Sequence, residues 1–130
     1  MSHRNGSAAI LDAVSTIFEH ADFSVGRTIT FVDGSERVVA AIGPTWVGRG
    51  VYQPGWRWSA HARPITGAAS QAHAGYVVSG AMVVQSSDGT EVVVSAGEAW
   101  FSGPDHDAWV AGDEPCVALD FPIAYPATLV

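Results

Sequence analysis

The sequence contains no lysine, and this absence narrows the classes of partner that the protein can bind. All six basic residues are arginines scattered along the chain, and 13 acidic residues give a formal net charge of −7. A nucleic-acid surface needs clustered basic side chains to neutralise phosphates, and an anionic membrane attracts the same kind of cluster. We therefore expect neither a nucleic-acid partner nor a membrane partner.

Cysteine and long apolar runs are also scarce. The single cysteine, Cys116, excludes an internal disulfide and a cysteine-rich zinc site, and its alternating apolar surroundings predict a buried core residue. No apolar run reaches transmembrane length, and the N-terminus lacks the apolar core and cleavage site of a signal peptide. The sequence therefore predicts a cytoplasmic protein.

Short segments with β-strand character make up most of the chain, whose 130 residues suit one domain. Residues 7–21 are the exception, because their apolar residues recur at helical spacing. We expect an N-terminal helical segment over 1–25 and a β domain over 26–130. The Asp88-Gly89 pair between two β-rich runs predicts a hairpin, and the regular turns indicate an antiparallel barrel or sandwich.

Three histidines raise the question of a metal site. Taken as a strand, residues 56–63 alternate between a polar face and an aromatic face. The polar face carries Arg57, Ser59, His61 and Arg63, and the other face carries Trp56 and Trp58. His73 opens the next predicted strand, and His106 follows a Gly-Pro-Asp turn. Each histidine alone is compatible with an ordinary solvated side chain.

Motifs around these histidines resemble those of the small single-domain cupins, over about residues 46–121. The segments that carry the resemblance are PGWRWSAH, HAGYVVSG, SDGTE and AGEAWFSGPDHDAWVAGDEP. Gly55 and His61 match the first cupin motif, Arg63 stands at its second histidine, and His73 stands at its glutamate. The resemblance implies an all-β antiparallel cupin or jelly-roll barrel with a short N-terminal helix.

The second cupin motif is matched less closely. Gly97 and the Gly-Pro-Asp turn fit it, but Ala108 stands at the histidine position and His106 comes two residues earlier. The resemblance implies that His61, His73 and His106 converge on a divalent metal ion, because three histidines with an open position form a catalytic zinc site. Zinc is favoured, with iron, nickel, manganese and copper as alternatives.

Further residues are expected to surround this site. The predicted substrate-binding residues are Arg57, Arg63, Tyr76 and Trp109. The arginines suit a carboxylate or phosphate group, and the aromatic residues could line a pocket. Asp105 or Asp107 could orient the His106 ring. The loop over residues 64–70 is expected to form part of the cavity rim.

The resemblance implies a metal-dependent enzyme acting on a small organic molecule. Isomerase, lyase or cyclase chemistry is favoured over redox chemistry, because no carboxylate ligand completes a two-histidine iron site. The alternatives are a metal-free binding module, a dioxygenase, and a structural dimer whose barrel is plugged by Trp58, Met82 or Phe101. A homodimer is expected, with the face of Trp56 and Trp58 against the partner.

Overall fold

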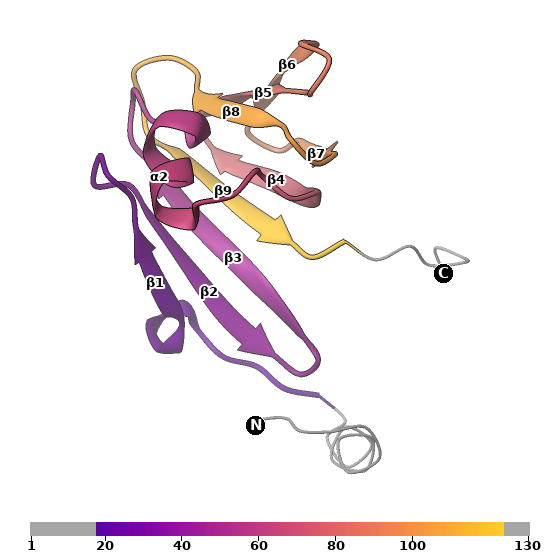
Figure 1. Ribbon diagram of the computed structural model, residues 1–130. Coiled ribbons are helices and arrows are strands. Elements are labelled where there is room, and N and C mark those ends of the chain that lie inside the picture. The colour runs from indigo at the N-terminus through magenta and orange to yellow at the C-terminus, as the bar shows by residue number, and fades with distance from the viewer. Residues whose placement is uncertain (1–17, 124–130) are drawn as a thin grey trace.

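The computed structural model describes residues 18–123, which form two antiparallel sheets facing each other (Figure 1). The larger sheet has the order β1-β2-β3-β9-β4-β7 and the smaller one the order β6-β5-β8. The larger sheet contains β1 (Arg27–Thr30), β2 (Glu36–Ile42), β3 (Thr45–Tyr52), β9 (Cys116–Phe121), β4 (His73–Ser79) and β7 (Ala99–Ser102). The smaller sheet contains β5 (Ala81–Gln85), β6 (Glu91–Ser95) and β8 (Asp107–Val110). The all-β antiparallel fold predicted from the sequence is confirmed.

The predicted Asp88-Gly89 hairpin joins β5 to β6, with Gln85 paired to Glu91 at its base. The Asp88 carboxylate accepts hydrogen bonds from the Ser86 hydroxyl and from the Thr90 amide. These bonds hold the pKa of Asp88 at about 2. Gly89 has a φ of 91°, a left-handed conformation that glycine adopts without strain.

Residues 56–63 do not continue as a strand, so the strand predicted there is wrong. One π-helical turn, η2 (Trp58–Ala62), runs directly into α2 (Arg63–Thr66), which lies in front of the larger sheet in Figure 1. The Asp107 carboxylate accepts bonds from the amide and hydroxyl of Ser59 at the start of this helical segment. Pro64 stands in the first turn of α2, where its missing N–H costs nothing.

The core lies between the two sheets and contains Trp56. This side chain is 3% exposed, and its ring centre lies 4.3 Å from that of Tyr52 and 5.7 Å from that of Phe31. The prediction that Trp56 faces a partner subunit is therefore wrong, because the residue packs inside its own chain. The homodimer itself stays a prediction.

The N-terminal part of the chain is described only from residue 18 onwards. Most of the helix predicted over residues 7–21 lies outside the described residues, and residues 18–21 are not helical. The first element is a single 3-10 turn, η1 (Phe23–Val25), whose Ser24 amide donates to the Asp22 carboxylate. Over residues 18–123, no helix has the length and apolar character needed to cross a membrane.

Candidate functional site

A cavity of about 730 Å³ lies between the inner face of the larger sheet, the smaller sheet and the η2–α2 segment. Trp58 and Met82, two of the residues expected to plug the barrel, form part of its wall and leave the space open. The third, Phe101, is 59% exposed. The structural dimer with a filled barrel is therefore not supported. Residues 65, 66 and 68–70 line the cavity, as expected for the loop after η2.

Glycines on the inner face make room for the cavity wall. A Cβ atom at Gly75 would lie 2.3 Å from the Trp100 ring, and one at Gly50 would lie 2.2 Å from the Tyr52 ring. Both approaches are shorter than any real contact, so these two aromatic rings can lie this close to the sheet only because the backbone beneath them carries no side chain. The result is a cavity with aromatic walls.

Three charged or titratable side chains meet on the sheet side of the cavity. The Arg37 Nε donates to Asp120 Oδ2 at 3.0 Å, and the other carboxylate oxygen of Asp120 lies 3.4 Å from His73 Nε2. Asp120 is 7% exposed. Strand register explains the meeting, because Asp120 on β9 lies between β3 and β4 and faces inward.

His106 reaches the same cavity from the turn before β8. Its ring Nδ1 lies 2.7 Å from the Gly103 carbonyl oxygen, and the residue is 5% exposed. The Ser70 hydroxyl donates to the His106 carbonyl oxygen at 2.6 Å. The ring centres of His106 and His73 are 5.0 Å apart. Two of the three predicted histidines therefore lie side by side in the cavity wall.

The surroundings of the two histidines shift their pKa values in opposite directions. Burial alone lowers the pKa of His73, but the hydrogen bond to Asp120, the charge of that carboxylate and the Gln71 carbonyl together raise it above the ordinary value. Burial lowers the pKa of His106, and the charge of His73 lowers it further against the effect of the Gly103 carbonyl. Neighbouring titratable groups whose pKa values are pushed apart are typical of an acid–base site.

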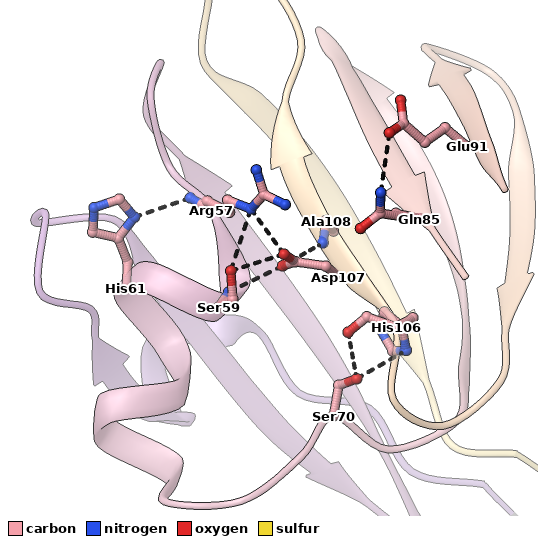
Figure 2. A network of polar contacts seen from close by, with 9 residues as sticks. All are labelled: Arg57, Ser59, His61, Ser70, Gln85, Glu91, His106, Asp107 and Ala108. Atoms are coloured by element: carbon pink, nitrogen blue, oxygen red, sulfur yellow. Dashed lines mark hydrogen bonds and ion pairs between the residues drawn. The ribbon is translucent and has the colours of Figure 1, made fainter. Parts of the chain in front are cut away.

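The third predicted histidine lies elsewhere. His61 belongs to η2, and its Nδ1 accepts a hydrogen bond from the Arg57 amide at 2.9 Å. Figure 2 shows its ring directed away from His106, with Arg57 and Asp107 between them in the view. The helical segment turns His61 out of the cavity, whereas a strand over 56–63 would have directed it inward. Sequence reasoning failed here because it assumed a two-residue period.

The predicted substrate-binding residues also lie outside the cavity lining. Arg57 pairs with Asp107 at 2.8 Å and lies over the Trp109 ring at 4.3 Å from its centre. Tyr76 is 38% exposed on β4. Arg63 lines a smaller pocket of about 250 Å³, which shares the side chains of Trp58 and His106 with the cavity. Asp105 and Asp107 form no hydrogen bond with the His106 ring among the described residues, and Gly103 and Ser70 contact its Nδ1 instead.

The described residues do not fit the three-histidine metal centre that the cupin resemblance implies. Within residues 18–123, no three histidine, cysteine or acidic side chains are placed to hold one ion. His73 Nδ1 lies 3.2 Å from the Gln71 carbonyl oxygen, and its Nε2 faces Asp120. Both partners accept hydrogen bonds, so both ring nitrogens act as donors and neither offers a lone pair to a metal.

Arg37 and Asp120 are the site residues that sequence reasoning missed. Asp120 could have been found, because in the run CVALDF it follows Cys116 and Ala118 at the same alternating positions. A carboxylate on the buried face of a strand is a strong functional signal, since buried charges require partners. Arg37 gave no such signal, because it is 83 residues from Asp120 in sequence and only strand register brings them together.

Comparison with known proteins identifies the fold. No protein-family model matches the sequence, and no curated protein matches it significantly. A cupin-superfamily sugar phosphate isomerase from Silicibacter pomeroyi aligns with a TM-score of 0.59 and 15% identity, over 83% of this chain and 77% of that one. KdgF from Halomonas sp. aligns with a TM-score of 0.55 and 20% identity, over 84% of this chain and 94% of that one.

An RmlC-like cupin from Shewanella frigidimarina aligns with a TM-score of 0.53 and 17% identity, over 83% of this chain and 92% of that one. These structural similarities come with low sequence identity, so they establish the fold alone. The chain has the fold of a small cupin domain, as the sequence motifs predicted.

Proposed function

We propose that this cupin-fold chain is an enzyme that binds a small organic molecule in its barrel cavity and moves a proton to or from it. Non-redox reactions such as isomerisation, elimination or cyclisation belong to this class. The observation that carries the proposal is the pair of histidine rings, 5.0 Å apart in one cavity wall and in opposite protonation environments.

His106 is the proposed general base. The Gly103 carbonyl can only accept a hydrogen bond, so the proton of a neutral His106 resides on Nδ1. Within residues 18–123 the Nε2 atom forms no hydrogen bond, so its lone pair can accept a proton from a substrate. The lowered pKa of His106 keeps the ring neutral at pH 7, which is the form that a base requires.

His73 is the proposed electrostatic partner. Acceptors at both ring nitrogens and a raised pKa favour its imidazolium form, and the residue lines the cavity in which the substrate would develop negative charge. Asp120 stabilises that cation and fixes the orientation of the ring. One structural neighbour is described as a sugar phosphate isomerase, which favours isomerisation within the proposed class.

Solvent deuterium exchange tests the proposal without a known product. A panel of sugar phosphates, sugar acids and neutral sugars is incubated with the protein in D2O, and loss of carbon-bound proton signals is followed by NMR. General acid–base groups contribute about 10²–10⁴-fold to rate, so His106→Gln and His73→Gln should lower exchange by about that factor. His61→Gln is the matched control and should leave exchange unchanged. Equal losses in all three variants would contradict the proposal.

The three-histidine metal centre is the alternative that the cupin resemblance implies. It would require His61 to leave the Arg57 amide and His73 to give up one of its two acceptors. Elemental analysis of protein purified without a metal-affinity tag, before and after dialysis against a chelator, separates the two models. We expect exchange to survive chelation; one metal ion per chain, lost together with activity, would favour the metal centre.

A metal-free binding module is the second alternative, because the cavity alone is sufficient for binding. Saturable binding of a panel compound with no exchange and no conversion would favour that function over an enzyme.

A further inference from the structure

We infer that the substrate is a small organic anion, a carboxylate or a phosphate monoester, whose charged group binds the free edge of the Arg37 guanidinium. The inference rests on the function proposed above, because it places the substrate in the same cavity. It adds the chemical class of the substrate and the residue that selects it.

The charge of the cavity wall is opposite to that of the chain. The wall contains two arginines, Arg27 and Arg37, against one carboxylate, Asp120. The whole chain has 13 acidic and only six basic residues. A cavity lined by one sign of charge with low-dielectric walls concentrates ligands of the other sign. An anionic ligand is therefore favoured at this site in an otherwise acidic protein.

The Arg37 guanidinium is preorganised to bind an anion. Its Nε is bound to Asp120, and its guanidinium carbon lies 5.4 Å from the centre of the Trp46 ring, so the position of the group is fixed. The side chain is only 25% exposed. Within the described part of the chain, its two Nη atoms form no hydrogen bond. They present two parallel donors, which match the two oxygens of a carboxylate or phosphate.

Gly48 provides the space that this arrangement needs. It lies on β3 directly opposite Asp120, and a Cβ atom there would lie 3.1 Å from both Nε and Nη2 of Arg37. The guanidinium therefore lies over bare backbone beside its carboxylate partner. Because Asp120 also contacts His73, an anion bound to Arg37 places the rest of a small molecule beside the two histidines.

Arg57 provides the matched control. It also forms an ion pair and lies over a tryptophan, but its Nε is shared between Asp107 and Ser59, its side chain is 45% exposed, and it does not line the cavity. Anion binding by Arg57 would be ordinary weak surface attraction. The difference between Arg37 and Arg57 therefore isolates the effect of the cavity.

The test is an NMR titration of 15N-labelled protein with sodium phosphate and, separately, sodium acetate, at constant ionic strength balanced with chloride. The indole signals of Trp46 and Trp109 report on Arg37 and Arg57 respectively. We expect a saturable shift of Trp46 with at least one anion and no saturable shift of Trp109. A phosphate response without an acetate response would assign a phosphate monoester, and the reverse would assign a carboxylate.

Variants sharpen the result. Hydrogen bonds to charged groups contribute about 1.5–3 kcal/mol, so Arg37→Gln should weaken anion binding by about tenfold or more. Arg37→Lys keeps the charge but loses the paired donors, and should have intermediate affinity. Arg57→Gln should bind as the wild type does. If neither anion shifts Trp46 saturably in the wild type, or Trp46 and Trp109 respond equally, the inference is overturned without any variant.

The two proposals fail separately. Saturable anion binding at Arg37 with no proton exchange on any compound would leave this inference standing and remove the proposed enzyme. Proton exchange on a neutral sugar that persists unchanged in Arg37→Gln would leave the enzyme standing and overturn the anionic substrate.

Discussion

The molecule contains the same four kinds of side chain twice, once at the cavity and once outside it. The inner quartet is Arg37, Asp120, Trp46 and His73, and the outer quartet is Arg57, Asp107, Trp109 and His61. In each, an arginine pairs with an aspartate through Nε and lies over a tryptophan. The outer contacts are the shorter ones, 2.8 Å against 3.0 Å for the ion pair and 4.3 Å against 5.4 Å for the ring.

Enclosure distinguishes the two quartets, and contact geometry does not. The Asp107 carboxylate is satisfied by Arg57, by Ser59 and by the Ala108 amide, so it fastens the helical segment to β8 (Figure 2). In the inner quartet, by contrast, the two Nη atoms of Arg37 form no hydrogen bond within the described residues, and Arg37 lines the cavity. A well-made ion pair is therefore weak evidence for function until its unused atoms and its access to a cavity are considered.

Removing the aspartate should give the largest difference between the quartets. Asp120→Asn leaves the Arg37 cation enclosed without its counter-charge and removes the carboxylate that raises the pKa of His73. Breaking a buried pair in this way costs about 3–5 kcal/mol. Asp107→Asn leaves a half-exposed Arg57 that water can solvate, so we expect a loss of about 1–2 kcal/mol from its hydrogen bonds. Denaturant unfolding measures both. Equal losses would show that the inner pair is not enclosed in solution.

Removing the arginine should give a smaller difference between the two quartets in the free energy of unfolding. Arg37→Gln leaves Asp120 with His73 as its remaining cation, and we expect a loss of about 2 kcal/mol from the unsatisfied carboxylate. Arg57→Gln breaks a largely exposed pair, whose contribution is at most about 1 kcal/mol. The same unfolding experiment applies, repeated in high salt. Salt should reduce the Arg57 contribution more, because exposed pairs are screened more strongly than enclosed ones.

Outside residues 56–63, sequence patterns predicted the antiparallel strands and the Asp88-Gly89 hairpin well, because alternation and turn residues are local signals. The Asp88-Gly89 turn needed only neighbouring residues to be identified. The helical segment was missed because polar residues alternate with Trp56, Trp58 and two alanines over the eight positions 56–63, which imitates a strand. Trp58, Ala62 and Ile65, which all line the cavity, have helical spacing instead.

The candidate site was only half predictable. His73 lies in the cavity wall because it begins a strand whose inward positions continue at Gly75 and Val77, both buried. Arg37 and Asp120 belong to strands separated by most of the chain, so their meeting depends on register and on the bare backbone of Gly48. No local pattern contains that information.

The pH dependence of stability should separate the two cavity histidines. His73 has a raised pKa, so its stabilising contribution is present below the unfolded value of about 6.5 and is lost as pH rises through its folded pKa. His106 has a lowered pKa, so its contribution is lost as pH falls from about 6.5 through its folded pKa. The free energy of unfolding should therefore decrease both above and below a pH of about 6.5.

Ring-proton NMR titration checks the assignment directly. The midpoint of His73 should lie above 6.5 and that of His106 below it. His73→Gln should flatten the decline on the alkaline side, and His106→Gln the decline on the acidic side. Midpoints in the reverse order would exchange the proposed roles of base and cation.

Gly48→Ala should have the smallest effect on stability and still separate the inner quartet from the outer one. The new methyl group would lie 3.1 Å from the Arg37 guanidinium, which must move by a few tenths of an ångström. Replacing glycine with alanine also restricts the unfolded chain, a gain of about 0.4–1 kcal/mol that offsets the crowding. The free energy of unfolding should therefore change by less than about 1 kcal/mol.

Anion affinity measured at Trp46 should nevertheless fall in Gly48→Ala, because paired donors lose strength when their orientation shifts. Gly103→Ala, whose added Cβ meets no atom within 4 Å, is the control and should leave the Trp46 response unchanged. Unaltered anion affinity in Gly48→Ala would mean that the anion does not bind the face of Arg37 that Gly48 positions.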